Sequence, residues 1–211
     1  KTLTLPKEFI PLWDNDDKSP EYKNAMRYLK ARDITRREIL KYGIGYCEEG
    51  LYRYRIIIPS YTNDGTLNYF VGRDYYGGNM KYKNPRVSKD VVGFESMIDW
   101  NQPVILCEGV FDAIAIKRNA IPLFGKTLPP KLLKRLVEHK VKKLYLILDS
   151  DAQKDSMKIV DKLKSYQIKV NLITLKDKDP SELGFEKTIN LIKQTKDSLS
   201  FSDIMKMKLG A

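Results

Sequence analysis

The chain is poor in the residues that build metal centres from nitrogen and sulfur ligands. Its 211 residues include one histidine, His139, and two cysteines, Cys47 and Cys107. Three such side chains cannot supply the four ligands of a structural zinc site. A disulfide between the two cysteines is not expected in a protein of intracellular type. We therefore expect no zinc site and no disulfide in this chain.

Long apolar runs are also missing. No stretch approaches the ~18–20 apolar residues that a membrane-spanning helix requires, and no secretory signal opens the chain. We therefore expect a cytoplasmic protein. The absence of a methionine before Lys1 suggests a fragment or a processed chain. With 42% hydrophobic and 31% charged residues, the composition is that of folded protein, long enough for one sizeable domain or two small ones.

Negative charge is in deficit, which bears on the kind of partner. There are 38 lysines and arginines against 27 acidic residues, a net charge of +11. A polyanion such as nucleic acid is the usual partner of such a protein. Residues 1–96 carry 17 basic and 13 acidic residues, and residues 97–211 carry 21 and 14. Neither half is an isolated basic tail, so folding must create any nucleic-acid surface.

Two acidic clusters are the most informative feature of the sequence. Residues 104–112 and 144–151 each begin with an apolar run typical of a buried parallel strand and end in carboxylates. Open α/β sheets bind ligands at the carboxyl ends of their strands, so Glu108, Asp149 and Asp151 should converge. Three adjacent carboxylates repel one another unless a cation lies between them, and oxygen ligands suit Mg²⁺ or Mn²⁺. This pattern indicates phosphoryl-transfer chemistry.

The N-terminal half has the pattern of an α+β subdomain. Ser19-Pro20-Glu21 predicts a helix start, and Thr35 with Glu38 predicts a capping box for a helix ending at Lys41. Strands are predicted over 53–59 and 66–73, joined by a turn at Asn63-Asp64-Gly65. We place the boundary to the second domain near 97–102, which gives domains 1–100 and 101–196 and a tail or stub at 197–211.

The C-terminal half alternates strands and helices, which predicts an α/β domain with a mostly parallel sheet and right-handed crossovers. Its expected elements are strands at 104–107, 121–124, 143–148 and 169–175, and helices at 110–119, 129–139, 153–166 and about 185–195.

The acidic motifs resemble the Toprim domain shared by bacterial-type primases, topoisomerases and some nucleases. Glu108-Gly109-Val110-Phe111-Asp112 is similar to its Glu-Gly-x-x-Asp motif, and Asp149-Ser150-Asp151 to its Asp-x-Asp motif. Lys178-Asp179-Pro180-Ser181-Glu182 resembles a later Lys-Asp-Pro-Asp-Glu motif. The resemblance implies a Rossmann-like metal-binding domain.

The N-terminal half resembles the basic subdomain of the catalytic core of bacterial and phage-type primases. The similar segments are 28–34, 42–46, 55–59, 72–73 and 81–84. In that family the subdomain handles nucleic acid and nucleotide phosphates. The residues that the resemblance implies for this role are Arg55, Arg73, Lys81, Lys83 and Lys89. Three aromatic residues nearby, Tyr69, Phe70 and Tyr82, are candidates for base stacking.

The resemblance implies a DNA primase, a nucleotidyltransferase that makes short RNA primers on single-stranded DNA from ribonucleoside triphosphates. Glu108, Asp149 and Asp151 would be catalytic and hold two or more Mg²⁺ or Mn²⁺ ions together with Asp179. Glu108 would act as a ligand or assist proton transfer. Asp112 would orient the site from the first turn of its helix. A replicative helicase or a separate zinc-binding domain are the implied partners, in a bacterial or phage-infected cell.

The sequence also departs from the family pattern. Gln153-Lys154 replaces a small Ala-Gly pair and puts a cation close to the expected metal site, and Ser181 replaces an acid of the third motif. The family's zinc domain and a helicase-binding bundle are not evident. Two other functions therefore stay open: a Toprim nuclease, which would use the same acids to cut, and a non-catalytic replication module that binds single strands. A topoisomerase would need a further domain for its tyrosine nucleophile.

Overall fold

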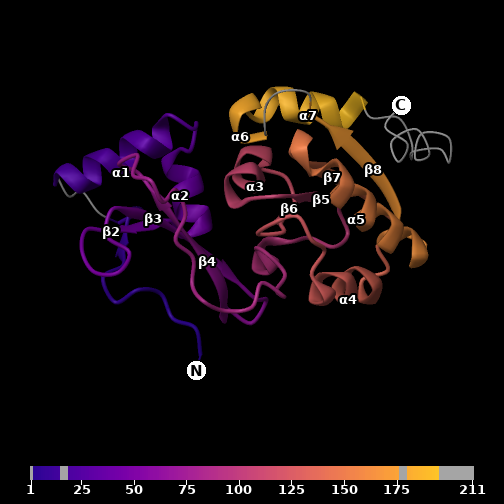
Figure 1. Cartoon of the computed structure of the whole chain (residues 1–211), viewed down its shortest axis with the longest axis horizontal. Helices are drawn as coiled ribbons and strands as arrows, with labels where there is room; N and C mark the ends of the chain where they lie inside the picture. Colours follow the sequence, from indigo (N-terminus) through magenta and orange to yellow (C-terminus); the bar gives the residue numbers. More distant parts are fainter. Residues whose placement is uncertain (1, 15–18, 176–179, 195–211) are drawn as a thin grey trace. The chain divides into compact units, whose positions relative to one another are not determined.

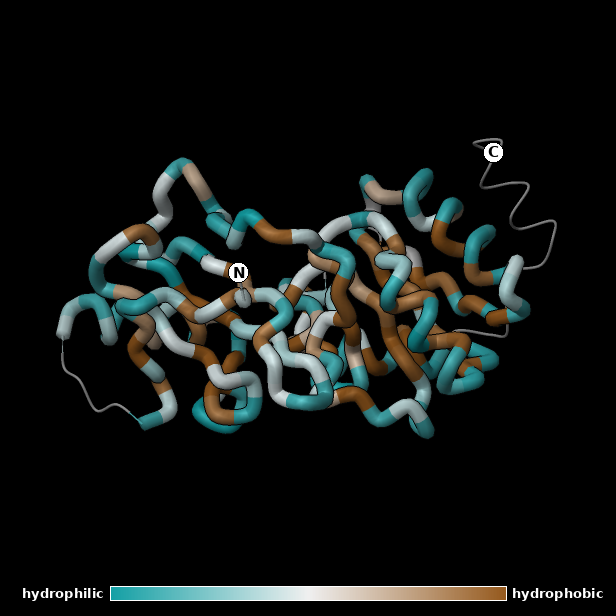
Figure 2. Tube along the Cα trace, turned by 90° about the horizontal axis from the view of Figure 1, so that it is seen from below, coloured by the Kyte–Doolittle hydropathy of each residue, from teal (hydrophilic) through white to brown (hydrophobic). Residues whose placement is uncertain are grey.

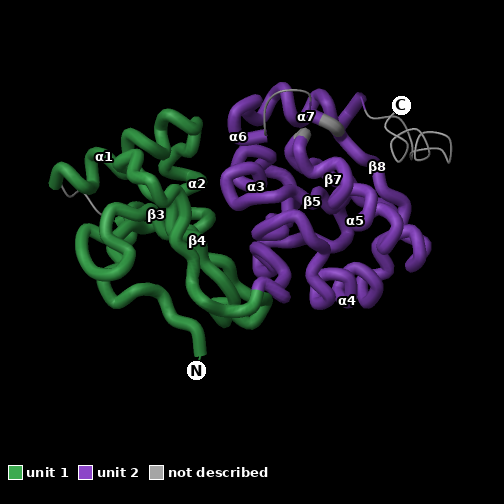
Figure 3. The backbone as a smooth tube through the Cα atoms, viewed as in Figure 1, with its two compact units in different colours: residues 1–88 green, residues 89–211 purple. Residues whose placement is uncertain are grey.

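The computed structural model describes residues 2–14, 19–175 and 180–194. The chain divides into two compact units, residues 1–88 and residues 89–211 (Figure 3). The first combines an antiparallel sheet with helices, and the second has a parallel sheet covered by helices. The predicted mixed α/β architecture is confirmed.

Unit 1 is built on a four-stranded antiparallel sheet. Its strands are β1 (Ile10–Pro11), β2 (Gly45–Cys47), β3 (Arg55–Tyr61) and β4 (Leu67–Asp74), in the order β1-β2-β3-β4. The predicted hairpin is the β3–β4 pair. The two short strands β1 and β2 were not predicted, because two or three residues are too few for an alternating pattern to be recognised.

Two helices of unit 1 begin at the predicted caps. In α1 (Pro20–Lys30) the Ser19 hydroxyl accepts a hydrogen bond from the Tyr22 backbone N–H at 3.0 Å. In α2 (Arg36–Tyr42) the Thr35 N–H donates to the Glu38 carboxylate at 2.8 Å, as a capping box requires. The two helices and the sheet enclose a core that includes the buried Leu29, Ile39 and Ile56 (Figure 1).

The segment after β4 folds back along that strand. The Lys83 N–H donates to the Gly72 carbonyl at 2.8 Å, and the Asp74 N–H donates to the Lys81 carbonyl at 3.0 Å. Arg73 and Tyr82 form an antiparallel bridge between these two bonds. A side chain at Gly72 would overlap the backbone oxygen of Lys83, so the close approach depends on glycine.

Unit 2 contains a four-stranded parallel sheet in the order β6-β5-β7-β8. Its strands are β5 (Val104–Cys107), β6 (Ala120–Pro122), β7 (Lys143–Leu148) and β8 (Lys169–Thr174). β5 and β7 are adjacent, with Cys107 opposite Ile147. Both strands therefore end at the same edge of the sheet, where each is followed by a carboxylate.

The helices of unit 2 follow the predicted alternation, with three additions, of which two are single 3₁₀ turns. The short α6 was not predicted separately from the helix after it. The elements are η1 (Glu95–Met97), α3 (Val110–Ile116), α4 (Pro130–Glu138), η2 (Ser150–Ala152), α5 (Gln153–Ser165), α6 (Pro180–Leu183) and α7 (Phe185–Gln194).

Alternate strand residues of unit 2 face two different helix layers. Val104 and Leu106 of β5 pack in a cluster with Leu132 of α4 and Val160 of α5. Neighbouring strand residues such as Ile105 point to the opposite face. On that side α3, α6 and α7 pack with one another (Figure 1). Hydrophobic segments accordingly run through the interior of this unit (Figure 2).

The first residues of unit 2 precede the boundary predicted near residue 100. Val92 belongs to the same hydrophobic cluster as the parallel sheet. Glu95 is 3% exposed and accepts a hydrogen bond from Arg135 of α4 at 2.7 Å. These contacts explain why the division between the compact units falls at residues 88 and 89. The predicted tail at 197–211 lies outside the described residues.

The close approach at Gly72 leads to a stability prediction. Gly72→Ala should lower the free energy of unfolding by about 1–3 kcal/mol, because the added methyl group meets backbone that cannot move away freely. Urea denaturation of the full chain measures this change. Gly78→Ala in the same segment is the control, since a Cβ there meets the Asp74 carboxylate only at 3.4 Å. An equal effect of both variants would contradict the steric explanation.

Candidate active site

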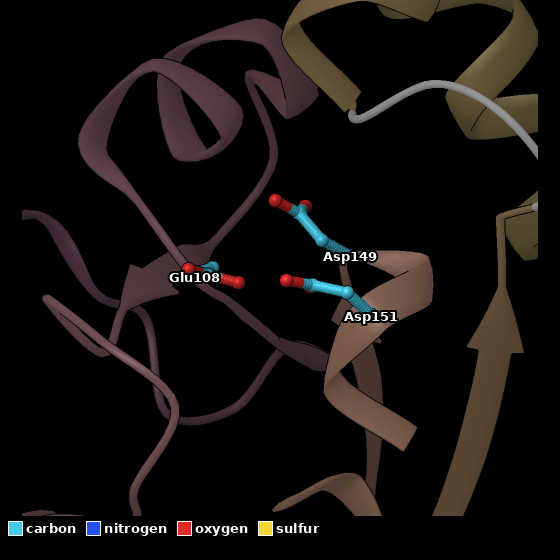
Figure 4. A group of neighbouring side chains, drawn as sticks. All are labelled: Glu108, Asp149 and Asp151. Atoms are coloured by element: carbon cyan, nitrogen blue, oxygen red, sulfur yellow. The ribbon is translucent and has the colours of Figure 1, made fainter.

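The adjacent parallel strands β5 and β7 bring three predicted carboxylates together. Glu108 directly follows β5, Asp149 directly follows β7, and Asp151 lies in the single turn η2 that precedes α5. Ligand atoms from the three side chains all lie within 4.8 Å of one another. In Figure 4 the carboxylates of Glu108 and Asp151 point toward each other, with Asp149 beside them. We call these three residues the acidic triad.

Burial and mutual repulsion set the electrostatics of the acidic triad. Burial raises the pKa of Glu108 above its ordinary value, and the negative charges of Asp149 and Asp151 raise it further. The Lys126 ammonium and a hydrogen bond from the Asp149 backbone act in the opposite direction. The Glu108 side chain is thus costly to ionise where it stands, and a nearby positive charge relieves that cost.

Lys126 supplies one such charge, and the sequence analysis did not select it. Its ammonium nitrogen lies 2.8 Å from both carboxylate oxygens of Asp151. The Asp151 carboxylate raises the pKa of Lys126 through this hydrogen bond. The sequence had drawn attention to Lys154 instead, which is exposed and forms no ion pair with any described residue. The sequence pattern does not indicate Lys126, because this residue follows the short strand β6 and is far from both acidic motifs in the sequence.

Asp112 joins the loop after β5 to the start of α6. One of its carboxylate oxygens accepts a hydrogen bond from the Gly109 N–H at 3.1 Å, which caps α3. The other accepts a hydrogen bond from the Ser181 N–H at 3.3 Å. Asp112 is 8% exposed and does not belong to the acidic triad. Its contacts are with the backbone of Gly109, next to Glu108, and with the backbone of Ser181 in the third motif.

The residues of the acidic triad fit a hard divalent cation. The Glu108 Oε2 atom is buried and has no hydrogen-bond partner in the described part of the chain. An oxygen in that position suits a metal ion better than a solvated surface charge. All the donor atoms are carboxylate oxygens, the ligands preferred by Mg²⁺ and Mn²⁺. Among the described residues this is the one cluster with such a ligand set.

Both cysteines are buried and free, as expected.

The predicted basic residues of unit 1 gather on β3, β4 and the segment after them. Arg55 donates to the Met80 carbonyl at 3.0 Å, which ties that segment to β3. The Arg73 guanidinium lies over the Tyr82 ring at 4.6 Å and over the Tyr28 ring at 5.7 Å. Lys81 is exposed, and the Lys83 ammonium is 6.0 Å from the centre of the Tyr52 ring.

The other predicted site residues have different outcomes. Lys89 belongs to unit 2, where its ammonium donates to the Phe124 carbonyl at 2.8 Å. Tyr69 and Phe70 are 1% and 2% exposed, so their predicted availability for base stacking is wrong, because both rings pack in the core of unit 1. Tyr82 is 45% exposed and remains available. Asp179, the predicted fourth metal ligand, lies outside the described residues.

Comparison with known proteins agrees with this arrangement. The Toprim-like family matches residues 105–184, which include β6, β7, β8, most of β5 and all three members of the acidic triad. The "Uncharacterized protein MG010" of Mycoplasma genitalium is 31% identical over 172 residues, 76% of each chain. The DNA primase of Thermotoga maritima is 25% identical over 230 aligned positions, which cover 85% of this chain but only 40% of that protein.

A solved structure described as the DnaG primase catalytic domain bound to ssDNA has the same fold. It superposes with a TM-score of 0.76, covering 91% of this chain and 77% of that chain, at 17% sequence identity. The fold is thus that of primase catalytic cores, and residues 105–184, which carry the acidic triad, match the Toprim-like family. Within that class, the chain belongs to the family of the mycoplasma protein MG010.

In the described residues, no helix is both long enough and apolar enough to cross a membrane. This agrees with the lack of long apolar runs in the sequence.

The raised pKa of Glu108 predicts how stability depends on pH. Its ordinary value is 4.5, and the folded chain holds the proton to a higher pH than the unfolded chain does. The stabilising contribution is therefore complete below about 4.5 and is lost as the pH rises through the raised pKa. Glu108→Gln should remove this loss and be more stable than the parent at neutral pH.

Urea denaturation between pH 4 and 7.5 in the presence of a chelator measures the effect. Glu186→Gln, at an exposed position of α7, is the control and should follow the parent profile. A Glu108→Gln protein that is no more stable than the parent at neutral pH would show that ionising the partly buried Glu108 beside Asp149 and Asp151 carries no cost.

Proposed function

We propose that this chain acts as the catalytic core of a DNA primase. The reaction would be the template-directed joining of ribonucleotides into a short RNA primer on single-stranded DNA. The acidic triad is the observation that carries the proposal, since Glu108, Asp149 and Asp151 lie within 4.8 Å at the carboxyl ends of β5 and β7. The likeness of the fold to primase catalytic cores supports it.

The metal chemistry would rest on the acidic triad and on Asp179. Divalent cations bound there would activate the primer 3′-hydroxyl and offset the charge that develops on the triphosphate. Glu108 and Asp149 come from the ends of paired strands, so the sheet fixes their separation before any ion binds. Such preorganisation avoids a rearrangement during the reaction. Asp112 would act as a positioning residue through its hydrogen bonds to Gly109 and Ser181.

The nucleic-acid role would fall to a stack of side chains in unit 1. Arg32 lies over the Tyr28 ring at 5.0 Å, and Arg73 lies between the rings of Tyr28 and Tyr82. Guanidinium groups bind phosphates, and an exposed tyrosine offers a stacking face to an unpaired base. Arg55, Lys81, Lys83 and Lys89 are proposed as further contacts to the template or the triphosphate.

The proposed partners are single-stranded DNA and ribonucleoside triphosphates. The solved relative described above carries single-stranded DNA, which supports the first of these. Selection of the template site and coupling to duplex unwinding would then need a separate zinc-binding domain and a replicative helicase. We propose both as partner proteins.

A non-catalytic module that binds single strands is the second candidate function. The ion pair between Lys126 and Asp151 favours it, since the Lys126 ammonium contacts both carboxylate oxygens of one member of the acidic triad. The stack in unit 1 serves this function as well as the first. The two candidates differ in whether the acidic triad supports chemistry.

Primer synthesis separates the candidate functions. The full chain, given single-stranded DNA of mixed sequence, labelled ribonucleotides and Mg²⁺ or Mn²⁺, should make short RNA. The double variant Asp149→Ala/Asp151→Ala should lose at least about a hundredfold in rate, because the metal ligands are removed. Glu186→Gln should keep the parent rate.

Other results would assign the acidic triad differently. If the parent cleaves the template and the double variant does not, the acidic triad cuts DNA and does not join ribonucleotides, and the protein is a nuclease. Binding of single strands by both proteins, with neither synthesis nor cleavage, would support the non-catalytic module.

Single-strand binding tests the stack in unit 1. Arg73→Gln should weaken binding of an oligonucleotide by about three- to tenfold and reduce its salt dependence by about one phosphate contact. Fluorescence anisotropy at several salt concentrations measures both quantities. Arg53→Gln is the control, because Arg53 also lies over a tyrosine ring, Tyr54 at 4.3 Å, but outside the stack. If the two variants lose affinity for the oligonucleotide equally, the loss comes from the change in net charge and not from the stack.

A further inference from the structure

Lys126 engages the oxygens that a metal ion would need. Its ammonium lies 2.8 Å from each carboxylate oxygen of Asp151, so both oxygens are taken by one cation. The Lys126 side chain is 31% exposed and that of Asp151 is 73% exposed. The pair therefore lies on the open side of the acidic triad, whereas Glu108 and Asp149 are partly buried. An arriving ion meets the ion pair before the deeper ligands.

The loop that carries Lys126 is fixed to the end of β5. The Leu123 N–H donates to the Cys107 carbonyl at 2.9 Å, and the Gly125 N–H donates to the Glu108 carbonyl at 3.3 Å. Gly125 has φ +155°, a conformation that side-chain-bearing residues rarely adopt. These contacts place Lys126 beside Glu108 through the backbone itself. The position of the ammonium is thus a property of the fold and not of one flexible side chain alone.

The same loop is held from its other side. The Lys89 ammonium donates to the Phe124 carbonyl at 2.8 Å, and the Phe124 ring is buried. Phe124 has φ +54°, an uncommon value for a large residue, so the surrounding contacts hold this backbone in place. A loop fixed at three successive residues delivers the next one, Lys126, to a defined place.

We propose that Lys126 is a built-in competitor of the metal ion, which holds Asp151 in the ion-free protein and must be displaced before a divalent cation binds the whole acidic triad. This inference rests on the metal role proposed above. It assigns to Lys126 a positioning function: its charge keeps three repelling carboxylates together when no ion is present. The cost is a weaker affinity for the ion.

The exposure of the pair sets the size of the effect. Exposed ion pairs change an equilibrium constant by a factor of about five or less. Repulsion between the ammonium and a divalent ion adds to this, and solvent screens it. We therefore expect Lys126 to weaken metal binding by about two- to tenfold, which a divalent ion overcomes at modest concentration.

Mn²⁺ binding to the full chain tests the proposal without reference to activity. Titration calorimetry at one pH and one salt concentration compares the parent with Lys126→Met, which keeps the length of the side chain and removes its charge. Lys154→Met is the matched control, since Lys154 lies three residues after Asp151 and is exposed. Asp149→Ala/Asp151→Ala shows which part of the binding belongs to the acidic triad.

Lys126→Met is expected to bind Mn²⁺ about two- to tenfold more tightly than the parent, and Lys154→Met to bind like the parent. Lys126→Arg keeps the cation and should bind Mn²⁺ no more tightly than the parent. Without metal, Lys126→Met should melt at a lower temperature than Lys154→Met, because the acidic triad has lost its internal cation.

Three results would overturn the proposal. If Lys126→Met binds Mn²⁺ at the acidic triad with the parent's affinity or more weakly, the ion pair does not compete, and the metal role stands. If both methionine variants gain equally, only net charge matters. If neither the parent nor Lys126→Met shows binding that depends on Asp149 and Asp151, the metal role fails together with this inference.

Discussion

Repulsion among three carboxylates at one edge of a parallel sheet is the constraint to which the rest of unit 2 responds. Glu108, Asp149 and Asp151 lie within 4.8 Å of one another. Burial raises the pKa of Glu108, and the charges of Asp149 and Asp151 raise it further. Such an arrangement is stable only if the surrounding fold contributes enough energy to hold it and positive charge lies close by. The parallel sheet provides the stabilising energy, and the loop after β6 provides the positive charge of Lys126.

The sheet can hold this edge because its two faces are covered by apolar contacts. Alternate residues of β5 and β7 face α4 and α5 on one side and the α3 layer on the other. Strands packed on both faces cannot slip in register without exposing their apolar side chains, so the residues that follow them are fixed in turn. Asp112 extends this order by linking the backbone of Gly109 to that of Ser181. Hydrophobic packing at the centre therefore determines where the charges lie at the edge.

The sequence was sufficient to predict the acidic triad but not its counter-charge. Apolar runs ending in Glu108 and Asp149 predict parallel strands, and neighbouring parallel strands must end at the same edge. The position of Lys126 depends on hydrogen bonds between two loops and on unusual backbone angles at Phe124 and Gly125, none of which leaves a periodic pattern. Lys154 attracted attention only because it is close to Asp151 in the sequence.

The same distinction holds in unit 1 and at the boundary between the units. Helix caps are local, so Ser19 and Thr35 were enough to predict where α1 and α2 begin. The burial of Tyr69 and Phe70 is not local, because it depends on which face of a short sheet is covered. Similarly, the residues before Pro103 look like a linker in the sequence, and only their contacts with α4 assign them to unit 2.

The contact of Lys89 with Phe124 also bears on how the protein can be divided into fragments. Lys89 is the first residue of unit 2, and its ammonium supports the backbone that presents Lys126. Val92 belongs to the apolar cluster of unit 2. Glu95 forms an ion pair with Arg135. A chain that began at Pro103, directly before the first parallel strand, would lack all three contacts. The segment from Lys89 to β5 is thus part of the folded unit 2 and not a linker to it, so a fragment that carries a stable acidic triad has to begin at or before Lys89.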